Sequence, residues 1–260
     1  MLRFNAYQLK WIAIVGMVTS HMVWAWAEVM PLWLMIPMMG AGGLTFPIMA
    51  YFVVEGYKYT SNLKGYMLRL FIFGVISIPF YILTFRSFAL NIMFSIMLGI
   101  AAMFLHDKIK IKPLFWILFV VVFLPVSFFF DWYVMGIVML ILYYVIKNET
   151  VRRIAPSVFG GLCWFLFIAF GIWSHMDMTA GGRYDALANF EATWGDMDFM
   201  ISVIFMLVGM ATAVVLLLRY NGERGKRMKW TFYIMYPLHF AVIGVISLLL
   251  GLVDFSLFGL

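Results

Sequence analysis

The sequence predicts an all-α integral membrane protein: one domain over residues 1–260 that forms a polytopic bundle of about nine transmembrane helices. Hydrophobic residues make up 65% of the chain and charged residues only 12%. Apolar runs of about 17–25 residues, the length that crosses a bilayer as a helix, recur throughout. Candidate spans cover 10–28, 32–56, 66–85, 88–105, 113–130, 132–146, 157–175, 199–218 and 231–251. Because the sixth is short and only Asp131 and Trp132 separate it from the fifth, eight or ten spans are alternatives.

The distribution of positive charge places the N-terminus in the cytoplasm. In that orientation, Arg86 and Arg183 are the only two of the 18 Lys and Arg residues that lie outside, as the positive-inside rule requires. The segment 176–198, with five acidic residues and one arginine, is then the only sizeable external loop. It is either a solvated linker or a docking site for an external substrate. The net charge of +6 lies at the inner surface, where it attracts anionic membrane lipids and gives no support for nucleic-acid binding.

The first span carries a polar stripe across the membrane. His21 lies eleven residues after Lys10, about 16 Å along a helix and near the middle of a core ~30 Å thick. Glu28, seven residues further on, returns to the same face. An ionisable residue at this depth is costly and by default faces the bundle interior, where it has a function. We therefore predict that these three side chains line a passage. The alternative is a neutral histidine that only bonds a neighbouring backbone group.

The second and third spans each carry an ionisable residue near the cytoplasmic side. Glu55 ends the second span, where it either takes part in proton transfer or simply pairs with Lys58 three residues later. Arg69 lies five residues past Lys64, about 7 Å into the third span. It either extends its side chain back to the surface or meets a phosphate group.

The middle spans carry polar groups without charge at depth. Asn91 and Ser95, four residues apart in the fourth span, present an amide and a hydroxyl on one face. They either join neighbouring helices or offer hydrogen-bond donors to a ligand. Asp131, at the outer boundary, is expected to cap a helix. Cys163 is the only cysteine and lies in an apolar run, and the four histidines are scattered, so we predict no metal site.

The last span follows a basic loop and carries a second membrane-embedded histidine. His239 lies ten residues after Lys229, about 15 Å along a helix, so it reaches the level predicted for His21. Tyr236, three residues earlier, shares its face and is placed to orient its ring. Pro237 leaves a backbone carbonyl of the preceding turn without its usual partner. A packing kink with one satisfied histidine is the alternative interpretation.

Four stretches resemble, in order and spacing, the signature blocks of the TraX family, the F-pilin acetylation family of integral membrane acetyltransferases. They are KWIAIVGMVTSHM, FPIMAYFVVEGYKYT with the following YMLRL, LNIMFSIMLG, and YNGERGKRMKWTFYIMYPLH. More distantly, Lys10 and His21 are similar to the Arg-x10-His of the acyltransferase three superfamily, which implies a role for His21 in acyl transfer. Many TraX-like sequences carry Asp directly before this histidine. This chain has Ser20 there, which supplies no carboxylate, so the group that orients His21 is not identified.

The resemblance implies acetyl-CoA as co-substrate and a multi-pass protein of the bacterial cytoplasmic (inner) membrane. The acceptor is expected to be an amine, such as a pilin-like or other peptide N-terminus. The expected catalytic residues are His21 as proton acceptor, with His239, Tyr236, Asn91 and Glu55. The residues expected to hold acetyl-CoA are Lys10, Lys58, Arg69, Asn221, Arg224, Arg227 and Lys229.

Two other functions fit the same residues. The first is an O-acetyltransferase that acts on a cell-surface sugar or lipid. The second is a proton-coupled transporter in which His21 and Glu55 relay protons, although the chain shows no inverted repeat of the kind many transporters have. A purely structural subunit of a secretion apparatus would leave two midplane histidines unexplained.

Overall fold

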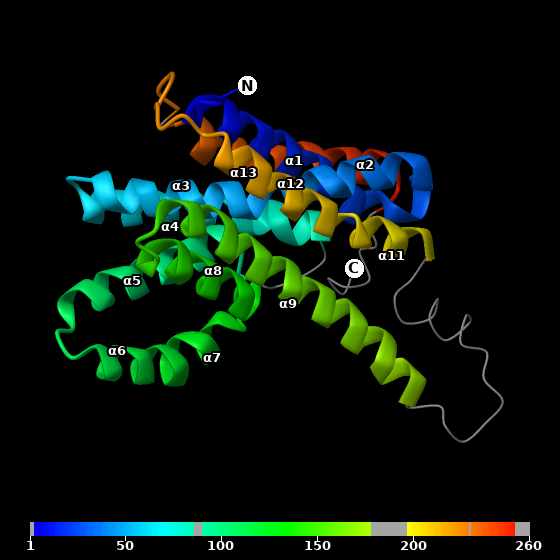
Figure 1. The fold of residues 1–260 in the computed structure, drawn as a ribbon. Helices are drawn as coiled ribbons and strands as arrows, with labels where there is room; N and C mark the ends of the chain where they lie inside the picture. The colour runs from blue at the N-terminus through cyan, green and yellow to red at the C-terminus, as the bar shows by residue number, and fades with distance from the viewer. Residues whose placement is uncertain (1–2, 86–89, 178–196, 229, 253–260) are drawn as a thin grey trace.

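The computed structural model describes residues 3–85, 90–177, 197–228 and 230–252, and it forms an elongated helical bundle (Figure 1). Among these residues no strand forms beyond two isolated bridges, Phe4–Tyr220 and Leu90–Phe130. The helices are α1 (Ala6–Trp26), α2 (Leu32–Gly43), α3 (Thr45–Tyr59), α4 (Leu63–Phe85), α5 (Ile92–Lys108), α6 (Lys112–Leu118), α7 (Leu124–Ser127), α8 (Tyr133–Val145), α9 (Glu149–Asp177), α11 (Met197–Ile204), α12 (Met206–Leu218) and α13 (Thr231–Leu249). The predicted all-α class is confirmed.

Six segments of the described chain are long and apolar enough to cross a membrane. They are Ala6–Val29, Leu32–Tyr59, Leu63–Phe85, Glu149–Ala169, Ile201–Leu218 and Thr231–Leu249. The other three predicted spans correspond to shorter helices: α5, the rod Lys112–Ser127, and α8. In the rod, a π-helical turn (Phe119–Phe123) joins α6 to α7. The chain is a multi-pass membrane protein.

The basic connections gather at one end of the bundle. The α3–α4, α5–α6 and α8–α9 connections lie at the same end as the start of α1 and the loop before α13 (Figure 1). That loop is tied to the N-terminal segment by backbone hydrogen bonds: Phe4 to Arg219, Asn221 to Phe4, and Ala6 to Glu223, at 2.8–3.0 Å. The arrangement agrees with the positive-inside prediction, which assigns this end to the cytoplasm.

Glycines let three helices pack closely at the centre. A Cβ added at Gly16 of α1 would lie 2.2 Å from the carbonyl oxygen of Ala41 in α2. A Cβ at Gly43 would lie 2.0 Å from that of Met206, and one at Gly209 would lie 1.9 Å from that of Gly40. Close approach of backbones at small residues is the usual way for helices to associate in membranes, where no hydrophobic effect drives them together. Helix α2 is thus held between α1 and α12.

Two helix boundaries differ from the sequence prediction. Helix α9 begins at Glu149, eight residues before the predicted 157, because the side chain of Asn148 accepts the backbone N–H of Val151 and caps its start. The predicted span 32–56 is split at Leu44 into α2 and α3. The glycines at 40, 42 and 43, just before the break, have a low helix propensity. The spacing of the apolar residues continues across Leu44 and therefore gives no sign of the break.

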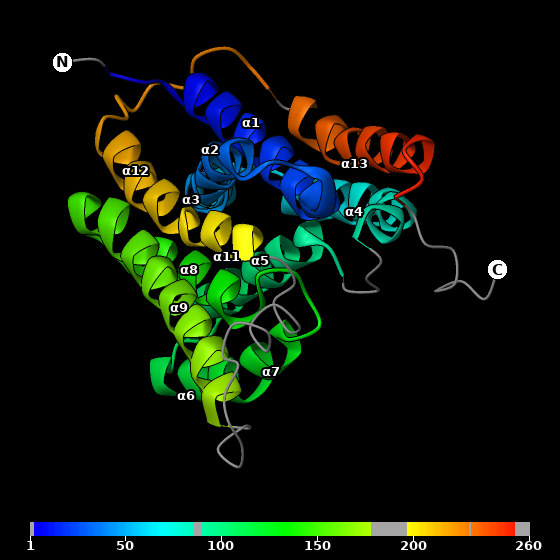
Figure 2. The ribbon, with the colours of Figure 1, turned by 90° about the vertical axis from the view of Figure 1, so that its right-hand side faces the viewer.

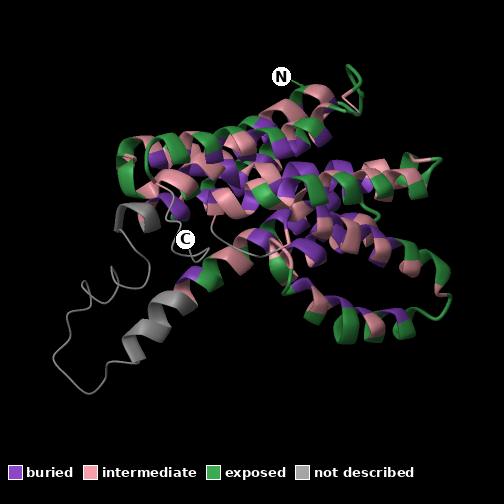
Figure 3. Cartoon of the chain, turned by 180° about the vertical axis from the view of Figure 1, so that it is seen from behind, coloured by how far each residue is buried: buried purple, intermediate pink, exposed green. Residues whose placement is uncertain are grey.

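The α6–α7 arm and the far end of α9 extend from the bundle (Figure 2). Many of the arm's apolar side chains are exposed, including Ile117, Val121 and Phe129 (Figure 3). In a membrane protein such side chains face lipid, which satisfies them as well as a protein interior does. The buried core lies instead where α1, α3, α5, α8 and α13 meet.

Candidate functional site

Two cavities enter the bundle from its two ends. We name the first the histidine cavity: it measures about 540 Å³, and its lining includes His21, Glu28, Tyr81 and Asp131. We name the second the basic cavity: it measures about 830 Å³. Its charged lining residues are Lys10, Glu55, Lys58, Arg69, Glu149, Arg152, Arg153, Arg224 and Lys226. The predicted stripe on α1 is therefore divided, because Lys10 lines one cavity while His21 and Glu28 line the other.

His21 and His239 form a direct pair between α1 and α13. The distance from His21 Nδ1 to His239 Nε2 is 2.7 Å, and the ring planes lie 19° apart. His21 is partly exposed in the histidine cavity, whereas His239 is buried and does not line it. The two residue counts that put both histidines at one membrane level agree with this contact. His239 also supplies the orienting group for His21 that Ser20 cannot.

The hydrogen bonds of the pair fix which ring nitrogens carry protons. His239 Nδ1 lies 2.9 Å from the carbonyl oxygen of Met235, and because a carbonyl only accepts, this nitrogen carries the proton. In a neutral ring His239 Nε2 is then an acceptor, so His21 Nδ1 must donate to it. His21 Nε2 is left with a free lone pair. The arrangement is a base oriented by a second histidine, which is in turn held by a backbone carbonyl.

Aromatic side chains hold the His21 ring. It stacks on Phe240 with a centroid distance of 4.9 Å and meets the edge of Phe85 at 5.3 Å. Tyr236 lies edge-on to His239 at 5.5 Å, and its hydroxyl accepts the backbone N–H of Ile92 at 3.3 Å. The predicted position of Tyr236 beside His239 is observed, but its hydroxyl contacts α5.

Asn91 lies outside both cavity linings. Its side-chain oxygen accepts the N–H of Met93 and caps α5, while its amide donates to the carbonyl of Gly74 in α4 at 2.9 Å. Ser95 donates to the carbonyl of Asp131 at 2.5 Å. Both side chains therefore join helices, which is one of the two interpretations that the sequence allowed.

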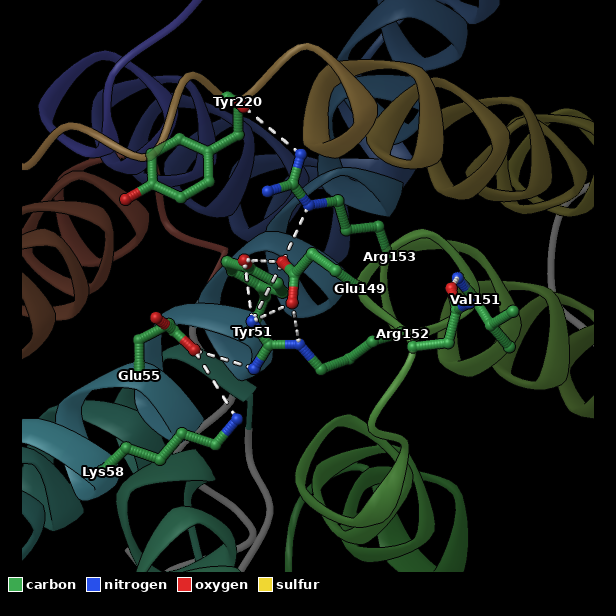
Figure 4. A network of polar contacts seen from close by, with 9 residues as sticks. Tyr51, Glu55, Lys58, Glu149, Val151, Arg152, Arg153 and Tyr220 are labelled. Atoms are coloured by element: carbon green, nitrogen blue, oxygen red, sulfur yellow. Dashed lines mark hydrogen bonds and ion pairs between the residues drawn. The ribbon is translucent and has the colours of Figure 1, made fainter.

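A network centred on Arg152 forms the wall of the basic cavity (Figure 4). Arg152 is 4% exposed, and its guanidinium bonds Glu55 at 2.7 Å, Glu149 at 2.8 Å and the hydroxyl of Tyr51 at 2.9 Å. Lys58 lies 3.8 Å from Glu55, a longer pair than the one with Arg152. Glu55 is thus mainly a partner of Arg152 and lies in a different cavity from His21. The sequence prediction missed Arg152 and Glu149 because it assigned 149–153 to a loop, and without them Tyr51, in the predicted span 32–56, had no recognisable partner. The spacing of Glu149 to Arg152 and Arg153, at three and four residues, was the available signal of a helix.

The basic cavity has cationic groups that remain open to an anion. Arg69 Nε is buried and has no hydrogen-bond partner within the described residues, and its guanidinium lies 5.7 Å from the centroid of the Tyr233 ring. Lys10 lies 5.0 Å from the centroid of the Phe52 ring. A buried donor without a partner is costly, so the cavity suits a phosphate better than a neutral ligand.

The loop before α13 contributes some of its predicted residues to the basic cavity. Arg224 and Lys226 line the cavity, but Arg227 does not, and Lys229 lies outside the described residues. The side-chain amide of Asn221 donates to the carboxylate of Glu223, and its side-chain oxygen accepts the backbone N–H of Glu223, both at 2.9 Å. These two bonds shape the turn. Gly222 and Gly225 have φ of 82° and 64°, conformations that glycine adopts without strain. The repeated glycines of NGERG therefore build the loop.

A thin partition separates the two cavities. On α1, Ile14 lines the basic cavity and Met17 the histidine cavity; on α3, Met49 lines the basic cavity and Thr45 the histidine cavity. Separations of three and four residues correspond to about 4.5–6 Å along a helix. Thr45 also donates to the carbonyl of Ala13 at 3.1 Å, which ties α1 to α3 at this level. About one helical turn thus separates the linings of the two cavities, and His21 lies seven residues, about 10 Å along α1, beyond Ile14.

Comparison with known proteins agrees with these observations. The family described as TraX protein matches residues 5–247. A curated relative, the "Probable fimbrial assembly protein FimC, serogroup H1" of Dichelobacter nodosus, is 26% identical over 255 residues, which cover 92% of this chain and 94% of the relative. No solved structure matches the chain. Since the family match extends over nearly the whole described bundle, this chain belongs to the TraX family.

Proposed function

We propose that this protein is an integral membrane acetyltransferase of the bacterial cytoplasmic membrane. It would move an acetyl group from cytoplasmic acetyl-CoA to an acceptor amine, a pilin-like or other peptide N-terminus, that enters from the opposite side. The TraX family is linked to pilin acetylation, and the relative from Dichelobacter nodosus is named as a fimbrial assembly protein. The observation that carries the proposal is the His21–His239 pair, which presents a free imidazole nitrogen in a cavity that about one helical turn of α1 separates from the basic cavity.

The basic cavity suits the phosphates of acetyl-CoA. Its cationic groups, including Lys10, Arg69 and Arg224, offer charge-assisted hydrogen bonds. Its deeper lining is apolar, with Ile14, Met49, Val53, Leu70 and Ile96, and would receive the uncharged arm that ends in the thioester. To reach His21, the thioester would have to pass the partition and advance about 10 Å along α1 beyond Ile14.

The histidine pair supplies general-base catalysis. His21 Nε2 takes the proton from the attacking nitrogen, and His239 keeps the ring oriented and disperses the charge through its bond to Met235. The oxyanion needs a donor nearby. The hydroxyl of Tyr81 lines the same cavity and forms no hydrogen bond within the described residues, so we assign it this role.

Donor binding is tested first, because that measurement needs no acceptor. Purified protein in detergent is titrated with acetyl-CoA while its melting temperature is followed, since a ligand of the folded state raises this temperature. We expect saturable stabilisation that weakens in Lys10→Gln/Arg224→Gln. The matched control is Arg227→Gln, whose side chain is exposed and outside the cavity lining. Absence of stabilisation by both CoA and acetyl-CoA would overturn the proposal and favour the proton-coupled transporter.

Transfer is tested next with labelled acetyl-CoA and a short peptide with a free N-terminus. His21→Ala is expected to lower kcat by about 10²–10⁴-fold, the usual contribution of a positioned base. His239→Gln retains an acceptor for His21 Nδ1 but cannot pass charge to Met235, so a smaller loss is expected. Equal rates for wild type and His21→Ala would remove His21 from the mechanism.

A further inference from the structure

Asp131 places a carboxylate in the histidine cavity without serving as a simple helix cap. Its backbone is anchored on both sides, because its N–H donates to Leu90 at 2.8 Å and its carbonyl accepts from Ser95 at 2.5 Å. Oδ1 accepts the backbone N–H of Trp132 at 2.9 Å. Oδ2 has no hydrogen bond within the described part of the chain, although Asp131 lines the cavity. The carboxylate therefore keeps one oxygen available to a ligand.

The turn that holds this carboxylate is strained. Trp132 has φ of 63° and Tyr133 has φ of 40°, conformations that bulky residues rarely adopt. The Trp132 ring stacks on Phe46 at a centroid distance of 4.3 Å, which helps to hold the turn in place. Backbone strain of this kind persists only where the surroundings enforce it, and it concentrates at functional sites.

The cavity around Asp131 is rich in aromatic side chains. Its lining includes Trp24, Trp26, Tyr81, Phe85, Trp132, Tyr133, Trp164 and Phe167. Among the described residues of the lining, Glu28 is the only other carboxylate, and none is a Lys or Arg. Aromatic faces combined with a carboxylate attract a cation.

We propose that Asp131 binds the ammonium group of the acceptor and accepts its first proton. This inference rests on the proposed function and deepens it, because it names the residue that recognises the acceptor. A protonated amine must lose two protons during acetylation, one to become a nucleophile and one as the amide forms. A single histidine base accounts for only one of them.

Asp131 and His21 each accept one of the two protons. The ammonium N–H proton passes to Asp131 Oδ2, which leaves a neutral amine and a carboxylic acid. The amine nitrogen then forms a bond to the thioester carbon, and His21 Nε2 takes the second proton. When the C–S bond breaks, this proton neutralises the CoA thiolate, and the Asp131 proton leaves to solvent through the cavity. An alcohol acceptor loses only one proton, so it does not require Asp131.

Burial supports this role, since it raises the pKa of Asp131 to about 6, while the bond from Trp132 N–H acts in the opposite direction. An α-ammonium group has a pKa of about 8. The equilibrium constant for transfer of its proton to a carboxylate of pKa about 6 is therefore only about 100-fold unfavourable. Among the described residues, Tyr81 of α4 and Tyr236 of α13 are the titratable groups on which the Asp131 charge acts, and His21 and Glu28 line the same cavity.

The test compares an amine acceptor with a hydroxyl acceptor on the full-length protein. A short peptide with a free N-terminus and its analogue with a terminal α-hydroxyl group are each offered with labelled acetyl-CoA to wild type and Asp131→Asn. The substitution keeps an oxygen for the N–H of Trp132 and removes the charge. We expect the ratio of amine to hydroxyl acetylation to fall by about 10- to 100-fold, as for loss of one partner of a buried charge pair. Glu223→Gln, an exposed carboxylate that lines neither cavity, is the matched control and should change the ratio by less than about threefold.

A binding measurement keeps the inference testable if no transfer is detected. The free peptide should raise the melting temperature of wild type more than its N-acetylated form does, and Asp131→Asn should lose this difference. An unchanged acceptor ratio, or an unchanged binding difference, would overturn the role of Asp131. If wild type acetylates neither acceptor and acetyl-CoA does not stabilise it, the proposed function fails instead.

Discussion

The guanidinium of Arg152 joins two carboxylates and a phenol between α3 and α9, where its side chain is 5% exposed. A buried charge without its partner is far more costly than a complete pair is stabilising. We therefore predict that Arg152→Gln lowers the free energy of unfolding by about 2–4 kcal/mol, because Glu55 and Glu149 lose their counter-charge. Thermal unfolding in detergent measures the change.

Two further variants separate this mechanism from a general loss of packing. Arg153→Gln removes a pair with Glu149, whose side chain is about half exposed, so it should cost less than about 1 kcal/mol. Arg152→Gln/Glu55→Gln should recover part of the lost stability, because the carboxylate of Glu55 no longer remains without its guanidinium partner. If the double variant is no more stable than Arg152→Gln, loss of the ion pair with Glu55 is not the cause of the destabilisation.

The raised pKa of Asp131 predicts a pH dependence of stability. Burial raises this pKa to about 6 from an ordinary value of 3.8, so between these values the folded state binds more protons than the unfolded state. Stability contributed by this group is therefore greatest below pH 4 and falls as the pH rises to about 6. Asp131→Asn should be more stable than wild type at pH 7.5 by about 1–3 kcal/mol. The difference should close below pH 4; a constant difference at every pH would contradict the assignment.

At the residue scale, the sequence predicted where polar groups lie but not their partners. Counting residues from Lys10 and Lys229 put His21 and His239 at one depth, and they are in contact. The hydrogen bond between specific ring nitrogens depends on how α1 and α13 are rotated, which no count along one helix can give. Arg152 was missed for a related reason: its burial comes from α3, far away in sequence.

At the element scale, close packing of α2 depends on glycines whose importance is visible only in the structure. A Cβ at Gly209 would overlap the carbonyl oxygen of Gly40 at 1.9 Å, and backbone cannot move aside as a flexible side chain can. We predict that Gly209→Ala separates α2 from α12 and lowers stability by about 1–3 kcal/mol, as measured by thermal unfolding in detergent.

The control is Gly161→Ala on α9, where the nearest atom would lie 3.9 Å from the added Cβ. Alanine favours a helix over glycine by about 1 kcal/mol, so this variant should be as stable as wild type or slightly more stable. Equal destabilisation by both substitutions would show that the close approach of α12 to α2 at Gly209 is not the cause.

Long apolar helices could be predicted from the sequence, but the positions at which helices break or begin could not. The spans of α4 and α13 follow from composition alone, because each is a long segment of high mean hydropathy. The break at Leu44 and the early start of α9 depend on contacts that apolar length does not report. Glu149 and Arg152 look like loop residues until α9 brings them against Tyr51.

At the scale of the whole molecule, the proposed function depends on two cavities that approach one another from opposite ends. Neither is readable from the sequence, since each collects residues from several helices. The sequence placed Lys10, His21 and Glu28 on one wall, but the partition at Ile14 and Met17 divides that wall. In the proposed function, access from opposite sides would let a donor and an acceptor in separate compartments reach the same histidine.

This arrangement predicts opposite accessibility for the two cavities. With Cys163 replaced by Ala, the chain contains no cysteine, and single cysteines can be placed at Glu28 and Lys58, exposed residues of the histidine cavity and the basic cavity. A membrane-impermeant maleimide should label Glu28→Cys in intact spheroplasts, because the positive-inside rule puts that cavity outside. Lys58→Cys should react only after the membrane is permeabilised. Both cysteines are labelled in detergent if the fold is intact, which serves as the control. Labelling of both from one side would mean that the partition does not separate the compartments, and the donor and acceptor would then have to share one entrance.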